Sequence, residues 1–158
     1  MKTKPYIIAL CLGAVLQATG FAQLPDKPKA PPVGVPRDAK LFNGKWYKVV
    51  FEKVSWQSAR DKCRSSGGQL VVIPDEPTWA FVKGLTPANV WLGATDEKVE
   101  GVWVSIDGTP MSFFDWCQWQ PDNAGGKENY LIIWKGQMND APNSEPSATG
   151  YICEWKDK

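Results

Sequence analysis

Residues 120–140 read QPDNAGGKENYLIIWKGQMND, a polar and glycine-rich stretch that surrounds a short apolar run. Five side chains in it carry oxygen donors, three of them carboxylates: Gln120, Asp122, Glu128, Asn139 and Asp140. Hard oxygen ligands clustered on loops suit Ca²⁺, which takes about six to eight oxygens, better than a transition metal. The chain has no His, which weakens the case for zinc or copper. If these residues close around one ion, the protein is a calcium-dependent binder.

The N-terminus has the pattern of a secretory signal peptide. Lys2 and Lys4 precede an apolar run over residues 6–16, and small residues precede the expected cleavage point. This pattern predicts a signal peptide over residues 1–22, and the run is too short to cross a membrane. We therefore expect a secreted protein, or a periplasmic one in a Gram-negative source. The chain has no Asn-X-Ser/Thr sequon, which fits a bacterial source.

Charge and cysteine content limit the partners of the predicted mature chain. The formal charge of the full chain is +1, and loss of the two N-terminal lysines changes it to about −1. A nucleic-acid-binding surface normally shows a basic excess, so we expect no nucleic acid partner. There is no second long apolar segment, so we expect no membrane span. In an oxidising compartment, Cys63, Cys117 and Cys153 predict one disulfide and one remaining thiol.

The chain divides into a linker and one domain. Residues 23–38 contain five prolines and few large apolar residues, which predicts an extended, stiff linker. Residues 39–158 are long enough for a single domain with a hydrophobic core.

Within this domain, two helices precede most of the expected strands. One helix is expected after the N-cap Ser55 and ends at Gly67, and another covers residues 76–85 with Pro77 in its first turn. Short strands are expected at residues 45–51, 70–73, 90–92, 102–104, 130–134 and 151–153. Two helices followed by short strands and long polar loops indicate an α+β fold.

Seven short motifs follow one another along the domain. They are Trp56-x-x-Ala59-x-x-x-Cys63, Trp91-Leu92-Gly93-Ala94, Glu100-Gly101-x-Trp103, Phe114-x-Trp116, Gln120-Pro121-Asp122, Met138-Asn139-Asp140 and Ile152-Cys153-Glu154. Their joint order and spacing resemble the C-type lectin-like domain over residues 40–156. The resemblance implies an α+β fold with two helices, two small antiparallel sheets and a long ligand-binding loop. It also implies a disulfide between Cys63 and Cys153 and a cis peptide bond before Pro121.

The resemblance further implies a calcium site that binds a sugar. By position, five side chains match the principal calcium site of the sugar-binding members: Gln120, Asp122, Glu128, Asn139 and Asp140. In the family, two sugar hydroxyls also coordinate the ion, and the same side chains hydrogen-bond those hydroxyls. An amide donates and accepts hydrogen bonds, whereas a carboxylate only accepts. The order of Gln120 and Asp122 is therefore the one that goes with galactose-type rather than mannose-type ligands.

Two further features near this site have competing interpretations. Four side chains match the family's auxiliary calcium site: Asp96, Glu100, Asn123 and Glu128. Because Asn occupies positions 123 and 129, where acids are expected, the charge is reduced, and a solvated acidic loop is favoured for Asp96 and Glu100. Trp119 neighbours the tripeptide and is a candidate to stack on a sugar, although most of the nine Trp are expected in the core.

Two departures from the family pattern fall on the ligand-bearing loop. Tyr130 and Asn143 stand where the family has a second, inner disulfide, and Met138 replaces the Trp of the family's Trp-Asn-Asp triplet. Both changes remove constraints from the loop, so we expect its order to depend more on the ion. Cys117 remains as a partly buried thiol or, alternatively, forms an intermolecular disulfide that makes a dimer.

The sequence predicts a binding protein rather than an enzyme. Without His, activation of a Ser or Cys nucleophile by His is excluded. Glu128 and the nearby Asp residues offer carboxylates for a hydrolase pair, but a metal site explains them better together. We therefore expect a secreted, calcium-dependent carbohydrate-binding protein with galactose-type preference. The alternative is a calcium-independent module of the same fold that binds a protein or a surface and no sugar.

Overall fold

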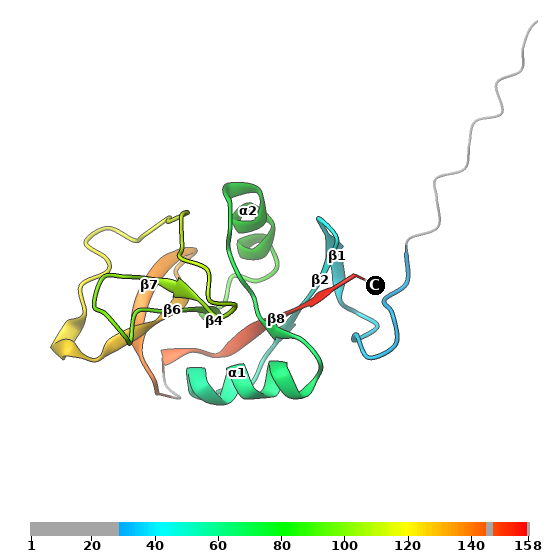
Figure 1. The fold of residues 1–158 in the computed structure, drawn as a ribbon, viewed down its shortest axis with the longest axis horizontal. Helices are drawn as coiled ribbons and strands as arrows, with labels where there is room; N and C mark the ends of the chain where they lie inside the picture. The colour runs from blue at the N-terminus through cyan, green and yellow to red at the C-terminus, as the bar shows by residue number, and fades with distance from the viewer. Residues whose placement is uncertain (1–28, 145–146, 158) are drawn as a thin grey trace, which may run out of the picture.

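Two α-helices and a mixed β-sheet make up the described part of the chain (Figure 1). The computed structural model describes residues 29–144 and 147–157. In chain order the elements are β1 Lys40–Phe42, β2 Lys45–Val50, α1 Trp56–Ser65, β3 Gln69–Leu70, α2 Glu76–Gly84, β4 Val90–Thr95, β5 Val104–Ser105, η1 Ala124–Gly126, β6 Glu128–Trp134, β7 Gln137–Pro142 and β8 Gly150–Lys156. The α+β class predicted from the sequence is confirmed. None of the described helices is long and apolar enough to cross a membrane.

The strands form two antiparallel groups that share one sheet. The strand order is β1-β2-β8-β4-β6-β7, with β3 paired to β8 and β5 paired to β4. β2 runs antiparallel to β8 over its whole length, and β6 runs antiparallel to β7. A short parallel pairing of β4 with β8 joins the two groups. The two small antiparallel sheets predicted from the sequence are therefore present, and they are hydrogen-bonded to each other.

The central strands bury side chains on both faces. Along β6, Tyr130 and Ile132 belong to the core that includes α1, whereas Leu131 and Ile133 belong to the core that includes α2. This alternation follows from the strand, in which successive side chains point to opposite faces. Figure 1 shows α1 and α2 on opposite sides of β8. Each helix therefore covers one core. Residues 130–133 of β6 are all apolar because neither face of the strand is solvated there.

Helix α1 forms as its spacing predicts. The side chain of the N-cap Ser55 accepts a hydrogen bond from the Ser58 backbone N–H at 3.3 Å, which satisfies one of the unpaired donors of the first turn. Trp56, Ala59 and Cys63 lie on one face and are buried. Cys63 is bonded to Cys153 of β8, with 5.5 Å between the two Cα atoms. The predicted disulfide is confirmed, and it joins the first helix to the last strand.

The segment predicted as a strand over residues 70–73 differs from that prediction. Only Gln69–Leu70 forms a strand, although the residues up to Ile73 are buried. The Val71 N–H donates to the Ile152 carbonyl at 2.9 Å, and the Val71 carbonyl accepts from the Gly93 N–H at 2.8 Å. Because its two bonds go to different strands, Val71 crosses between them instead of extending one ladder. The crossing is tight, since a Cβ on Gly93 would lie 2.7 Å from the Leu70 carbonyl oxygen.

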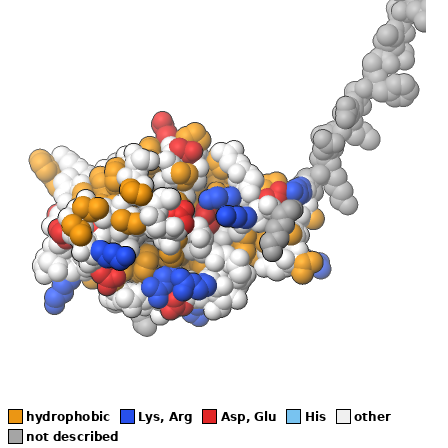
Figure 2. Space-filling model, in the orientation of Figure 1, with side chains coloured by type: hydrophobic (Ala, Val, Ile, Leu, Met, Phe, Trp, Pro, Cys, Tyr) orange, Lys and Arg blue, Asp and Glu red, His pale blue; other side chains and the backbone are white. Residues whose placement is uncertain are grey.

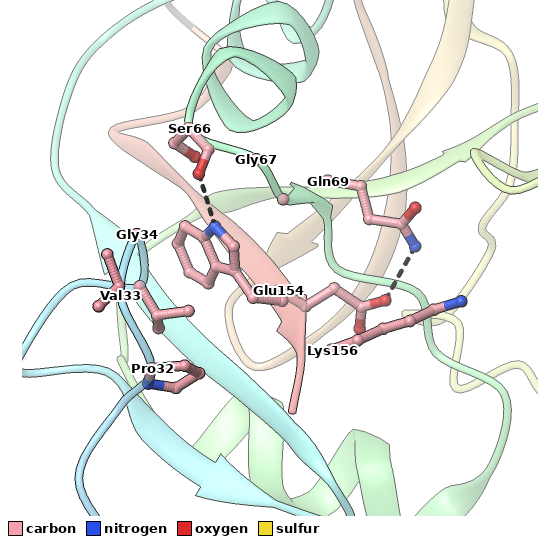
Figure 3. Close-up of a pocket in the computed structure, with 11 residues that line it drawn as sticks. Pro32, Val33, Gly34, Ser66, Gly67, Gln69, Glu154 and Lys156 are labelled. Atoms are coloured by element: carbon pink, nitrogen blue, oxygen red, sulfur yellow. Dashed lines mark hydrogen bonds between the residues drawn. The ribbon is translucent and has the colours of Figure 1, made fainter. Parts of the chain in front are cut away.

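The described part of the predicted linker is not an extended tether. The Val35 N–H donates to the Pro32 carbonyl and the Ala39 N–H to the Pro36 carbonyl, both at 3.0 Å, which makes two turns. Val35 then packs against the core beside α1, whereas Val33 stays exposed. Figure 3 shows the resulting cavity of about 470 Å³, with Pro32 on one side and Ser66 on the other. The predicted signal peptide and residues 23–28 lie outside the described residues.

Candidate functional site

Three carboxylates from separate parts of the sequence meet at one end of the sheet. One side-chain oxygen from each of Asp122, Glu128 and Asp140 lies within 4.8 Å of the other two. Asp122 precedes η1, Glu128 begins β6, and Asp140 lies on β7. The β6–β7 pairing, in which Asp140 stands opposite Leu131, fixes two of these three acids. The sequence predicted that all the donors lie on loops. This prediction is wrong for Glu128, which lies on β6, and for Asn139 and Asp140, which lie on β7.

Asp140 is the buried centre of the cluster, and its side chain holds the loop that carries Asp122. The residue is 1% exposed. One of its oxygens accepts from the Asn123 backbone N–H at 2.7 Å, and the other accepts from the Asp122 N–H at 3.3 Å. Asn123 has a φ of 43°, a left-handed conformation that Asn tolerates better than most residues. The loop therefore turns around the Asp140 carboxylate and brings Asp122 beside it.

Glu128 closes the other side of the same turn. Its carboxylate accepts from the Ala124 N–H at 3.0 Å, and its backbone N–H donates to the Asn123 side-chain oxygen at 3.1 Å. These two bonds cross the glycine-rich turn at η1. As a result, the loop between Asp122 and Glu128 is ordered by side chains that also belong to the acidic cluster.

The two amides of the predicted site are hydrogen-bonded to the backbone of two residues of this cluster. The Gln120 side-chain oxygen accepts from the Asp122 N–H at 3.2 Å, and the peptide bond between Gln120 and Pro121 is cis, as the resemblance implied. The Asn139 side-chain nitrogen donates to the Asp140 carbonyl. An amide that donates through its nitrogen keeps its oxygen as an acceptor or ligand atom. The structure therefore brings the oxygens of Asp122, Glu128 and Asp140 together, and it links the two amides to the same residues through backbone hydrogen bonds.

The electrostatics of the cluster favour the binding of a cation. Burial raises the pKa of Asp140 above its ordinary value, and the charge of Asp122 adds to the rise, while backbone N–H donors lower it. Burial also raises the pKa of Glu128, helped by the charges of Asp140 and Asp122 and opposed by the Ala124 N–H. Carboxylates that repel one another in a partly desolvated site are stabilised by a bound cation. Three carboxylates with two amide oxygens fit a hard divalent ion such as Ca²⁺.

The residues of the predicted auxiliary site are linked to the cluster through Asn123. The Asn123 side chain donates to the Glu100 carboxylate and accepts from the Glu128 N–H. Asp96 is 2% exposed, and one of its oxygens accepts from the Gly101 N–H at 2.8 Å. Desolvation, together with the charges of Asp96 and Asp140, raises the pKa of Glu100. The group of three close acids includes neither Asp96 nor Glu100, so the structure does not bring this second set together as tightly as the first.

Two other predicted residues lie just before the tripeptide. Trp119 is 84% exposed and directly precedes Gln120. Cys117 is half-buried, and among the described residues it has no disulfide partner. Its Sγ lies 3.4 Å from the Trp134 carbonyl oxygen, and burial raises the pKa of the thiol. A partly buried thiol is therefore its state within the described chain.

Contacts that sequence reasoning missed hold the loop in place of the inner disulfide. Tyr130 packs on Trp56 with 4.8 Å between ring centroids, and the Asn143 side-chain oxygen accepts from the Gln57 N–H at 3.2 Å. The Asp115 carboxylate accepts from the Trp79 indole N–H of α2 at 2.5 Å. No local pattern distinguishes such an Asp from a solvated one, because its partner lies on a distant helix.

Comparison with known proteins identifies the scaffold. The family model of the Lectin C-type domain matches residues 52–155. The chain belongs to the C-type lectin domain family. It is 33% identical over 122 residues to the hepatic lectin of Gallus gallus, a match that covers 75% of this chain and 58% of that protein. It is also 38% identical over 90 residues to the type-2 ice-structuring protein of Osmerus mordax, covering 55% of this chain and 51% of that protein.

A solved relative supports the same assignment. The carbohydrate-recognition domain of the mouse scavenger receptor C-type lectin aligns with a TM-score of 0.72 and 31% identity, over 78% of this chain and 98% of that one. The chain spans little more than half the length of the two curated relatives. None of the three relatives is an enzyme by name. All three come from vertebrates and give no support to the bacterial source that the sequence suggested.

Proposed function

We propose that this C-type lectin domain protein is secreted and binds carbohydrate through Ca²⁺. One observation carries the proposal: oxygens of Asp122, Glu128 and Asp140 lie within 4.8 Å of one another. Gln120 and Asn139 complete the donor set. The hepatic lectin and the mouse recognition domain, which are lectins by name, favour a sugar as the ligand.

Each residue of the proposed site has a distinct task. Asp140, buried and hydrogen-bonded to the loop backbone, would hold the ion together with Asp122 and Glu128. A bound Ca²⁺ supplies open coordination positions for two sugar hydroxyls. Gln120 offers both a donor and an acceptor to those hydroxyls, and Asp122 only accepts. This order of amide and acid is the basis for the galactose-type preference.

Calorimetric titration with Ca²⁺ tests the ion site. We expect binding in the range of roughly 10⁻⁴ to 10⁻³ M that extracellular calcium modules show. Asp140→Asn should abolish the heat, whereas the matched control Asp61→Asn, an exposed acid on α1, should leave it unchanged. The stoichiometry decides the auxiliary site, since one ion per chain leaves Asp96 as a buried acid and Glu100 as an exposed one, with no second ion between them. A chain that takes up no Ca²⁺ and gains no thermal stability from it contradicts the proposal.

Competition for an immobilised galactoside tests the sugar. We expect retention in Ca²⁺, release by chelation, and elution by galactose at lower concentration than by mannose. Mannose eluting at the lower concentration would refute the donor–acceptor argument while leaving the calcium-dependent lectin intact. The same column run with Asp140→Asn should show no retention.

A module that binds a non-sugar ligand is the second candidate, and the ice-structuring relative favours it. A glycan array without Ca²⁺-dependent signal, from a protein that does take up Ca²⁺, would select this candidate. Glycan binding that survives chelation would contradict this candidate and would also remove the role of Ca²⁺ in the proposed function. Thermal hysteresis measured on the same sample distinguishes an ice surface from a protein partner.

Export and assembly are also proposals. N-terminal sequencing of secreted protein should begin after Ala22, followed by the proline-rich segment and the domain from residue 39. A dimer linked through Cys117 would run at twice the monomer mass on a non-reducing gel and would disappear in Cys117→Ser. A monomer on both gels leaves Cys117 as the half-buried thiol of the described structure.

A further inference from the structure

The indole of Trp119 is exposed in a way that the fold does not explain. Six of the nine Trp side chains are buried, whereas Trp119 is 84% exposed. None of the aromatic pairs within the described residues includes it. A large apolar ring left in water forfeits the burial that stabilises the other Trp residues. The Trp119 side chain therefore adds neither buried apolar area nor an aromatic contact to the folded domain.

The backbone of Trp119 is also strained. Its φ is 69°, in the left-handed region that a bulky side chain rarely adopts. The turn that imposes this conformation is fixed, because the Gln120 N–H donates to the Cys117 carbonyl at 3.0 Å and the Cys117 N–H donates to the Met138 carbonyl at 2.8 Å. The indole is therefore held outward by a turn anchored to β7. Local strain of this kind concentrates at ligand-binding positions.

Trp119 stands next to the calcium site. It precedes Asp122 by three residues, which limits the separation of their Cα atoms to about 11 Å. The intervening Gln120 turns its side-chain oxygen to the Asp122 N–H, so the two residues belong to one loop surface. Figure 2 shows hydrophobic side chains at the edge of the molecule where this loop lies in Figure 1. Gln118 and Gln120 flank Trp119 in the sequence, and Gln118 is exposed.

We propose that Trp119 forms a second subsite and that the ligand is a galactoside whose anomeric substituent is a ring with a flat, apolar face. The inference rests on the proposed function, which places the first ring on the ion. A single exposed indole, with no other exposed aromatic of the described residues paired to it, matches one ring in area. A protein partner would need a larger apolar surface around the anchor. A second sugar ring and an aryl group share this chemistry, and the experiment separates them.

Paired glycosides test the subsite. Inhibition of galactoside binding is measured with methyl galactoside, phenyl galactoside and lactose, using both anomers of the first two. Stacking on Trp119 should make the preferred phenyl anomer about three- to tenfold more potent than its methyl counterpart. Lactose exceeding methyl galactoside by a similar factor identifies a sugar as the second ring, and a gain confined to the phenyl compound identifies an aryl group. If the competition experiment shows a preference for mannose, the methyl and phenyl glycosides of mannose are used instead.

Two variants assign the effect to Trp119. Trp119→Asn removes the indole and suits a left-handed backbone, so it should lower the ratio of phenyl to methyl potency to about one while Ca²⁺ uptake and methyl galactoside binding stay unchanged. Trp119→Tyr should keep most of the ratio. Phe51→Ala, which removes a 69% exposed ring at the end of β2, is the matched control and should leave the ratio intact. A phenyl-to-methyl ratio of one in the unmodified protein, or an undiminished ratio in Trp119→Asn, overturns the second subsite alone. If the unmodified protein binds no glycoside at all, the proposed function is overturned and this inference with it.

Discussion

The frame of the domain and its ligand-bearing loop are held together in different ways. The frame, which comprises α1, β2 and β8, has a continuous six-residue ladder, a buried disulfide and two apolar cores. The loop between β5 and β6 has hardly any ladder, and bonds from its backbone to side chains such as Asp140 set its shape. The frame is therefore stabilised by burial and cross-linking, whereas the loop is stabilised by polar groups that a ligand ion can reinforce. Changes to the frame should alter the stability of the whole chain, and changes to the loop should alter binding.

Removal of the disulfide should have the largest effect. Cys63→Ala with Cys153→Ala opens a bridge that spans 90 residues of sequence, and the chain-entropy relation gives a loss of about 4–5 kcal/mol in the free energy of unfolding. Denaturant unfolding in the absence of Ca²⁺ measures it. Cys117→Ala is the control and should cost much less, because its thiol is only half-buried and unbridged among the described residues. If both variants lost the same free energy of unfolding, the disulfide would not be what stabilises the frame.

Calcium should stabilise the loop and leave the frame almost unchanged. Saturation at about a hundred times the dissociation constant adds about 2.7 kcal/mol to the free energy of unfolding. Below that global limit, hydrogen exchange should slow at the Asp122 and Asn123 amides, which donate to Asp140. The Val49 and Ile152 amides of the β2–β8 ladder should exchange through local opening at the same rate with and without Ca²⁺. Slowing spread evenly over the frame would contradict a separate loop unit.

Loss of the Asp115 anchor should come next. Asp115 accepts from the Trp79 indole and lies 3.5 Å from the Lys83 ammonium, so it ties the loop to α2. In Asp115→Ala the indole N–H loses its acceptor, which costs about 1–3 kcal/mol. We expect Ca²⁺ affinity to fall as well, although α1, β2 and β8 are unchanged. The reason is that the anchored segment leads directly to Gln120-Pro121-Asp122. Asp107→Ala, on an exposed turn outside this anchor, is the control, and an equal fall there would remove the special role of Asp115.

The comparison also explains how much the sequence could predict. Helix α1 was predictable because its cap and its buried residues lie within one segment, and β6 was predictable because both of its faces are apolar. β7 was missed because its sequence, QMNDAP, contains Gln, Asn, Asp and Pro and no β-branched residue. It is a strand only because β6 supplies a hydrogen-bonding partner. The five donors were found from their order, which the resemblance supplied.

What could not be predicted depends on contacts that are distant in sequence. The partners of Asp115 and Asn143 lie on α2 and α1, and no spacing rule connects them. Val71 bonds to two different strands, which a pattern of apolar residues cannot express. The folding of residues 29–38 onto the domain was missed because proline content predicts stiffness and not a docking partner. Of these contacts, those of Asp115 and Asn143 hold the loop that lacks the family's inner disulfide.

The smallest effect should come from the cap of α2, the helix that carries the loop anchor. The Asp75 carboxylate accepts from the Thr78 N–H at 2.8 Å, and hydrogen bonds from the Thr78 side chain and backbone lower the pKa of Asp75. Asp75→Ala should cost about 1 kcal/mol at neutral pH. Because the folded-state pKa lies below the unfolded one, this stability is present above the ordinary pKa of Asp and is lost as the pH falls through the lowered value. Asp75→Asn keeps an uncharged acceptor and should show no such pH dependence. If unfolding curves of the Asp75→Ala protein run parallel to those of the unmodified protein down to the lowest pH, the charge of the cap contributes nothing to α2 or to the loop it anchors.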